Sequence, residues 1–241
     1  MPRPEPNRVD GLLLLDKPQD WTSFDVVNLI RRRFHLDKTG HCGTLDPLAT
    51  GLLVVLCGRA TRLQDSLMGQ DKVYEATMRL GVETDSEDST GQVTATGDVS
   101  GVTEAQVRET SQSFLGEILQ TPPMVSAIKV QGQPLYKLAR RGEVVERKAR
   151  PVTIHALELL RVELPEVDFR LTCSKGTYVR TLCADWGRRL GCGGHMSALR
   201  RTRSGRLSVE SAVRVDEVRE WGLEELRRRV MSLEEVAALY A

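Results

Sequence analysis

HCGTLDPLATGLLVVLC, residues 41–57, joins a loop punctuated by glycine and proline to a continuous apolar run. The apolar residues 52–56, bounded by turn residues, predict a buried strand. Asp46 precedes Pro47 inside the loop, where proline fixes φ and the flanking glycines permit a close approach of the backbone. The loop can therefore project a carboxylate from a rigid turn, although Asp-Pro also initiates ordinary turns and Asp46 could serve only as a cap.

Strands and helices follow one another irregularly on both sides of this stretch. Apolar periodicity and turn residues predict strands over 11–15, 72–80 and 127–130, an antiparallel pair over 150–163 and 168–174, and helices over 24–34 (capped by Thr22 or Ser23), 59–68, 103–114, 178–190, 221–230 and 232–239. A short helix is also expected to run through 140, after a turn at 132–134. Pro122 and Pro123 are expected to end the element that begins at 103. Because regular βαβ spacing is missing, the pattern favours an α+β fold with a largely antiparallel sheet.

Composition places the chain among ordinary globular proteins. It has 241 residues, 40% of them hydrophobic and 28% charged, which suits one large domain or two small ones with a sizeable core. No apolar run approaches the roughly 20 residues that span a bilayer, and the N-terminus does not resemble a signal peptide. Five cysteines without a CxxC pair favour a reducing cytoplasm over a disulfide framework or a zinc ribbon.

The formal net charge of +1 conceals a separation of charge along the chain. Residues 81–117 and the tail from 210 are acidic, whereas 129–150 and 175–206 are rich in lysine and arginine. One basic block alone is as easily a solvated face. Two such blocks, with Tyr136 and Tyr178 beside the bases, favour a polyanion such as RNA or DNA as the partner.

Six motifs occur in one order between about residues 11 and 206: GLLLLDKPQDWTSFDVV, GHCGTLDPLATGLLVVLCGRATRL, DKVYEATMRLGVETDSED, TPPMVSAIKVQGQPLYKLARRG, CSKGTYVRTLCADWGRRLG and HMSALRRTRSG. Together they resemble the bacterial tRNA pseudouridine(55) synthases, the TruB family. The resemblance implies the pseudouridine synthase fold, a mixed, mostly antiparallel sheet with surrounding helices and a central RNA-binding cleft. It also implies an isomerase that detaches the uracil of a T-loop uridine at N1, turns it and rejoins it through C5.

The resemblance assigns three catalytic residues. Asp46 matches the essential aspartate, which can act on ribose C1′, on the uracil ring or by assisting base departure. Arg180 matches the arginine that pairs with this aspartate and keeps it ionised, rather than an ordinary surface arginine of a helix. Tyr74 matches the tyrosine that stacks on the uracil and is placed to remove the C5 proton, although a half-buried strand aromatic would look the same.

Other residues are expected to bind the RNA. By the resemblance, Tyr178 and Leu199 line the uracil pocket, and His41 fills the stack that the flipped nucleotide leaves. Lys17 supports the floor of the site or contacts RNA. A mobile loop at about 122–150 folds over the tRNA, and its phosphate contacts come from bases that include Lys129, Arg147 and Lys148.

The resemblance also bounds the organisation of the protein. We expect a catalytic domain over 1–210 and a short helical tail over 211–241 without a full PUA domain. The expected partner is the T arm of tRNA, bound by a monomer in the cytoplasm without a membrane or a protein partner. No cofactor or metal is required, and the four histidines show no ligand spacing. Two alternatives are an RNA-binding or tRNA-folding protein on the same scaffold, and a family synthase that acts on another RNA.

Overall fold

The computed structural model describes residues 5–241 except 127–128, 131, 136–137, 139–140, 142 and 144. The side chains of 129, 130 and 134 are also outside the description. The chain forms two compact units. Unit 1 contains residues 1–74 and 200–241, and unit 2 contains residues 75–199. No helix among the described residues is long and apolar enough to cross a membrane.

Unit 1 combines a mixed sheet with short helices. Its strands follow the order β14-β1-β3-β12, in which β1 pairs antiparallel with β3 but parallel with β14, and β3 pairs parallel with β12. Its elements are β1 (Gly11–Lys17), α1 (Ser23–Arg33), β2 (Thr39–Cys42), β3 (Thr50–Cys57), η1 (Gly58–Leu63), α2 (Gln64–Met68), the start of β4 (Lys72–Leu80), the end of β12 (Gly194–Ser204), β13 (Leu207–Ser208), η2 (Val209–Ser211), β14 (Val213–Arg214), η3 (Glu217–Glu220), α6 (Leu223–Arg229) and α7 (Leu233–Tyr240).

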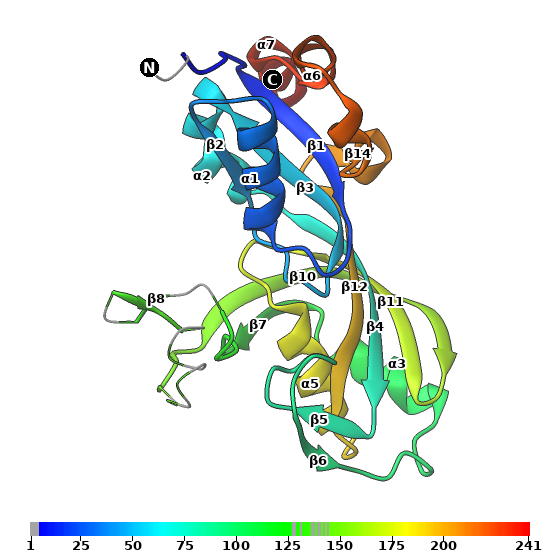
Figure 1. Cartoon of the computed structure of the whole chain (residues 1–241). Helices are drawn as coiled ribbons and strands as arrows, with labels where there is room; N and C mark the ends of the chain where they lie inside the picture. Colours follow the sequence, from blue (N-terminus) through cyan, green and yellow to red (C-terminus); the bar gives the residue numbers. More distant parts are fainter. Residues whose placement is uncertain are drawn as a thin grey trace. The chain divides into compact units, whose positions relative to one another are not determined.

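The apolar runs of β1 and β3 form the centre of unit 1. Leu12, Leu52 and Leu56 are fully buried and belong to a cluster that also includes Val236 of α7. The end of the chain, drawn orange to red in Figure 1, lies beside β1, and backbone hydrogen bonds join Leu12 to Met231 in both directions. The first strand of the chain and its last helices therefore share one core.

Helix α1 begins where the sequence predicts. The Thr22 side chain accepts a hydrogen bond from the Asp25 backbone, and the Asp25 carboxylate accepts one from the Thr22 backbone, which completes a capping box. Val26, Val27 and Ile30 are buried on one face. This apolar face fixes the helix in unit 1 and so fixes the position of its N-terminus.

Unit 2 is built on the strand order β12-β4-β11-β10-β7. Its remaining elements are β5 (Val82–Thr84), β6 (Val93–Thr96), α3 (Glu104–Gln112), β7 (Gly116–Gln120), β8 (Lys129–Val130), β9 (Gln133–Pro134), β10 (Arg150–Glu163), β11 (Glu166–Cys173) and α5 (Val179–Arg189). Trp186 of α5 is fully buried, with its ring centroid 6.1 Å from that of Phe114 and 5.5 Å from that of Phe169. This aromatic cluster anchors α5.

The α+β prediction is confirmed, as are β4, the antiparallel pair β10–β11 and the helices α1, α3 and α5. One prediction is wrong, and one strand is not predicted at all. The prolines 122–123 do not end the helix that begins near 103, because α3 ends at Gln112 and β7 intervenes. The sequence pattern does not indicate β12, because its arginines suggest a solvated basic segment. The expected helix near 140 falls mostly outside the described residues.

Candidate functional site

The Asp46 loop leaves the sheet of unit 1 where β3 changes partner. Along one edge of β3, Val54 pairs with Cys42 of β2, whereas Gly51 pairs with Arg201 of β12. The loop between β2 and β3 emerges at this exchange. Gly51 has a φ of +96°, and a Cβ there would lie 2.3 Å from the carbonyl oxygen of Arg201, so only glycine fits.

A buried serine fixes the loop to the N-terminus of α1. The Ser23 hydroxyl donates to the carbonyl oxygen of Leu45 at 3.0 Å and accepts from the Leu45 amide at 2.9 Å. Both backbone groups of the residue before Asp46 are therefore bonded to one side chain. Because Ser23 is 2% exposed, water does not compete for these bonds.

Lys17 fixes the other side of the loop. Its fully buried ammonium donates to the carbonyl oxygens of Trp21 (2.6 Å), Pro18 (2.8 Å) and Pro47 (3.4 Å). Burial lowers the pKa of Lys17 to about 8, and the negative charge of Asp46 opposes part of that shift. Lys17 is therefore bonded to the loop, whereas its predicted role at the floor of the site, with RNA contact as the alternative, stays a prediction.

Arg201 supplies a third support that the sequence analysis did not select. It is 1% exposed, and its guanidinium donates to the carbonyl oxygens of Leu52 (2.8 Å) and Gly43 (3.0 Å). The Leu52 carbonyl lies in β3 between Gly51, which pairs with β12, and Val54, which pairs with β2. Burial lowers the pKa of His41, and the positive charge of Arg201 lowers it further, so the imidazole is neutral at pH 7.

The two remaining site residues of unit 1 are partly accessible. Asp46 is half-buried, and its carbonyl oxygen accepts from the Ala49 amide at 3.0 Å, so the residue does form a turn. This bond engages the backbone of Asp46 and not its carboxylate. Tyr74 is half-buried near the start of β4, as its predicted place in a strand requires.

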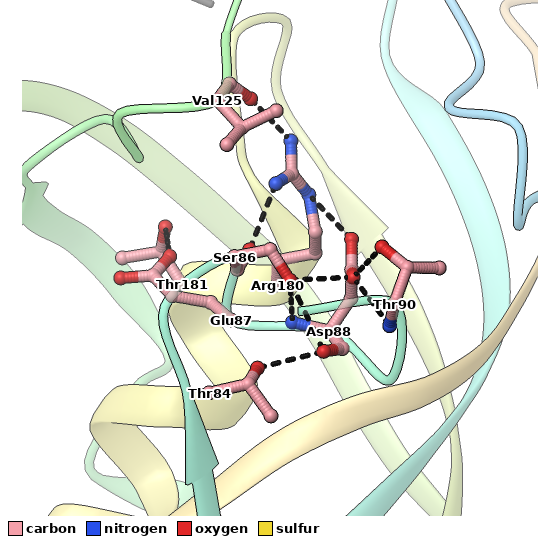
Figure 2. A network of polar contacts seen from close by, with 8 residues as sticks. All are labelled: Thr84, Ser86, Glu87, Asp88, Thr90, Val125, Arg180 and Thr181. Carbon is pink, nitrogen blue, oxygen red and sulfur yellow. Dashed lines mark hydrogen bonds and ion pairs between the residues drawn. The ribbon is translucent and has the colours of Figure 1, made fainter. Parts of the chain in front are cut away.

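In unit 2, Arg180 is the centre of a buried polar network (Figure 2). Its guanidinium donates to the carbonyl oxygens of Ser86 (2.9 Å) and Val125 (2.8 Å), and its Nε lies 3.7 Å from a carboxylate oxygen of Asp88. Arg180 is 3% exposed, so the alternative of an ordinary surface arginine is wrong. Two separate segments, the turn that contains Ser86 and Asp88 and the segment at Val125, instead determine where its side chain points.

Asp88 is itself held by the turn around it. Its carboxylate accepts from the hydroxyls of Ser86 (2.7 Å) and Thr90 (2.6 Å), and its carbonyl accepts from Thr84 (2.6 Å), as Figure 2 shows. Neighbouring Glu87 has a φ of +62° and accepts from Thr181, and burial raises its pKa. In the sequence these acids stand out only as negative charge, so the pattern does not indicate Asp88 as the partner of Arg180.

Tyr178 and Leu199 are both half-buried in unit 2. Tyr178 is the N-cap residue of α5, and its backbone exchanges hydrogen bonds with the side chain of Gln120 at 2.7 and 3.0 Å. Leu199 lies in β12. Their predicted place at a uracil pocket, like the pairing of Asp46 with Arg180, joins residues of different units and stays a prediction.

The predicted RNA-binding loop is only partly described. The side chain of Lys129 falls outside the described residues, whereas Lys148 is exposed. Arg147 is half-buried and donates to the Pro122 carbonyl oxygen at 3.0 Å. One of the three expected phosphate contacts therefore also ties the two ends of this segment together.

The second basic block is less available to a polyanion than the sequence suggests. Arg180 and Arg201 are buried, Arg188 bonds Glu83 and Asp185, and Arg200 forms two hydrogen bonds with Asp16. Two acids of 81–117, Glu83 and Asp88, thus neutralise Arg188 and Arg180 inside unit 2. Lys175, Arg203 and Arg206 remain exposed.

No group of three or more histidine, cysteine or acidic side chains that could hold a metal ion occurs among the described residues. The arrangement around Asp46 is a half-buried carboxylate on a loop bonded to a serine, a lysine and an arginine. Such a rigid carboxylate suits acid–base or nucleophilic chemistry.

Sequence comparison identifies close relatives of the chain. Residues 31–179 match the family model of the N-terminal domain of TruB family pseudouridylate synthases, and 180–238 match that of the C-terminal domain of tRNA pseudouridylate synthase B. A tRNA pseudouridine synthase B of Opitutus terrae is 48% identical over 95% of both chains. The enzyme of the same name from Aromatoleum aromaticum is 55% identical over 85% of this chain and 66% of its own.

Two solved structures with a similar fold are of multi-component complexes. A chain of a Cbf5-Nop10-Gar1 complex is 33% identical with a TM-score of 0.73, covering 95% of this chain and 62% of its own. A chain of an H/ACA RNP bound to a substrate RNA containing 2′-deoxyuridine is 31% identical with a TM-score of 0.68, covering 92% and 58%. This chain therefore spans about 60% of those solved chains.

Proposed function

Because the chain belongs to the TruB family of pseudouridylate synthases, we propose that it converts the uridine at position 55, in the T loop of tRNA, into pseudouridine. The observation that supports this most directly is the Asp46 loop, whose backbone is bonded on both sides of the carboxylate. Relatives 48–55% identical are named tRNA pseudouridine synthase B, which agrees with the proposed substrate.

Asp46 is the proposed catalytic carboxylate. In its ionised form it acts as a nucleophile at C1′ or on the ring, or assists departure of the base. The buried cation of Lys17 lies within electrostatic range of this carboxylate and favours ionisation. The target nucleotide must leave the base stack to reach Asp46, at a cost of a few kcal/mol.

The remaining predicted site residues complete the proposal. Arg180 pairs with Asp46 and orients it, and the network around Arg180 fixes the direction of its guanidinium in unit 2. Tyr74 stacks on the uracil and removes the C5 proton, and Tyr178 and Leu199 form the pocket wall. The reaction is an isomerisation without net oxidation or hydrolysis, so it requires no redox cofactor.

RNA recognition in this proposal combines stacking with phosphate contacts. His41 fills the vacated position in the T loop, and its Nδ1, which is buried without a hydrogen-bond partner among the described residues, agrees with a neutral ring. Lys129, Arg147 and Lys148 contact phosphates, which position the RNA. The protein acts as a monomer, and a cytoplasmic location follows from its substrate.

Replacing Asp46 tests the assignment. Asp46→Asn removes the charge but keeps the shape, so it should abolish pseudouridine formation while RNA affinity stays within about threefold. Carbodiimide labelling of a tRNA transcript with primer extension detects the product at position 55, and filter binding gives the affinity. Asp65→Asn, at an exposed position on α2, is the charge-matched control. Full turnover by Asp46→Asn would exclude Asp46 as the essential group.

A further inference from the structure

A cavity in unit 1 lies against the far side of Lys17, and most of its lining has no role in the proposed chemistry. Its volume is about 540 Å³, within the usual range for small-molecule sites. It is lined by Asp16, Lys17, Pro18, Trp21, Thr50, Arg200, Arg214, Val215, Asp216 and Arg219. We call it the Trp21 cavity. It combines an indole ring with four basic side chains and two acidic ones.

Trp21 and Arg219 are the distinctive pair of this cavity. Trp21 is half-buried, and the guanidinium carbon of Arg219 lies 5.5 Å from its ring centroid. Arg219 is exposed and forms no ion pair within the part of the chain that the structure describes. The guanidinium covers one face of the indole, and the other face is a stacking platform for a nucleobase, with a cation at hand for its phosphate.

The other charges leave the cavity positive. Arg200 is neutralised by two hydrogen bonds with Asp16, at 3.0 and 2.6 Å, and Arg214 by Asp216 at 2.7 Å. The charge of Arg219 then remains at the cavity, whereas the fully buried ammonium of Lys17 faces the negative charges of Asp46 and Asp20. The cavity therefore favours an anionic ligand that carries an aromatic group.

The Trp21 cavity is also joined to the catalytic loop. Lys17 donates to the carbonyl oxygens of both Trp21 and Pro47, and the Asp20 amide donates to Pro47 at 2.8 Å. The turn that presents the indole is thus bonded to the residue that follows Asp46. A ligand stacked on Trp21 would be held in fixed register with the catalytic carboxylate.

We propose that the Trp21 cavity binds an unpaired nucleotide of the substrate RNA other than the reacting uridine. The base stacks on Trp21, and the phosphate is contacted by Arg219. This inference rests on the proposed function for the identity of the RNA. It adds a second anchoring point on the RNA, and its base recognition is tolerant of sequence because every base has a stacking face.

The first test is a Trp21→Leu variant of the full chain with a labelled T-arm stem-loop. We expect the Kd to rise about tenfold or more, as for loss of one base–aromatic stack. Trp21→Phe should restore much of the affinity. An unchanged Kd in Trp21→Leu overturns the proposal.

Abasic RNAs distinguish stacking from general damage to the fold. Each unpaired nucleotide of the stem-loop is replaced in turn by an abasic one. The effect of Trp21→Leu should vanish for one of these RNAs, the one that lacks the stacked base. An equal loss for every RNA would overturn the proposal. The matched control is Trp221→Leu, because Trp221 has Arg229 at 5.6 Å but does not line the cavity.

The last two experiments vary the salt concentration and measure the binding of free nucleotides. Loss of affinity in Arg219→Gln should shrink as salt rises, whereas that in Trp21→Leu should not. Free UMP and AMP serve as the alternative ligand, with quenching of tryptophan fluorescence as the signal. If they bind while Trp21→Leu leaves RNA affinity unchanged, the cavity serves a free nucleotide and the RNA assignment is overturned. Failure of the wild-type chain to modify tRNA would count against the proposed function, independently of these binding results.

Discussion

At the scale of single residues, buried cations organise the site more than the acids do. Lys17, Arg180 and Arg201 are each almost fully buried, and the hydrogen bonds described above run mainly to backbone carbonyl oxygens. A cation in this setting converts flexible loop backbone into a fixed support, because its donors would be costly to leave unpaired. Sequence motifs named Arg180 and Lys17, but nothing in the local sequence separates buried Arg201 from its exposed neighbour Arg203.

The lowered pKa of Lys17 gives a signed pH dependence of stability. The unfolded chain keeps this proton up to about pH 10.5, whereas the folded chain releases it near pH 8. Between these values the unfolded state binds more protons, so the free energy of unfolding rises with pH, by up to about 3 kcal/mol from this group. The difference between wild type and Lys17→Gln isolates the effect. In chemical denaturation at pH 7, 8, 9 and 10, the free energy of unfolding of wild type should rise relative to that of the variant as the pH increases. A difference that stays constant with pH would refute the lowered pKa of Lys17.

The network around Arg180 predicts a large effect of a conservative change. Asp88→Asn removes the negative charge beside a buried guanidinium, so the free energy of unfolding should fall by about 3 kcal/mol. The rate at saturating RNA should fall at least tenfold, since the direction of Arg180 depends on this contact. Asp185→Asn, which removes a carboxylate bonded to the more exposed Arg188, is the control. Equal rates for the two variants would show that Asp88 does not position Arg180.

At the scale of elements, the site depends on where β3 changes partner. Alternating and apolar patterns are enough to predict β4, β10, β11 and the helices α1 and α5, because each has one buried face. They do not predict β12, whose parallel pairing with β3 depends on long-range contact. The rigid loop could therefore be anticipated from Gly51 and Pro47, but its support by β12 could not.

Substitutions of two adjacent residues at the start of α1 distinguish support of the Asp46 loop from capping of the helix. Ser23→Ala removes both bonds to Leu45, so it should loosen the Asp46 loop and lower the rate at saturating RNA about tenfold. Thr22→Ala removes only the cap and should cost about 1 kcal/mol of stability with little change in rate. Thermal unfolding and single-turnover kinetics measure the two effects. A similar rate loss in both variants would mean that the hydroxyl of Ser23 has no specific role.

At the scale of the whole molecule, net charge is a poor guide to the RNA surface. The acidic block 81–117 and the basic block 175–206 look like separate surfaces in the sequence, yet Glu83 and Asp88 bind Arg188 and Arg180 within unit 2. What attracts a polyanion is the subset of bases that stay exposed without such partners. That subset depends on tertiary pairing, which explains why the sequence predicted an RNA partner but overstated the contribution of one block.

Charge-matched double variants test this distinction. Lys148→Gln with Lys175→Gln removes two exposed bases, and we expect weaker RNA binding at low salt and a salt dependence reduced by about two phosphate contacts. Arg161→Gln with Arg170→Gln removes the same charge from β10 and β11, where each arginine already bonds two carboxylates. This control should bind RNA almost as wild type does and lose a little stability instead. If both double variants weaken binding equally, the overall charge attracts the RNA and the exposed lysines are not specific contacts.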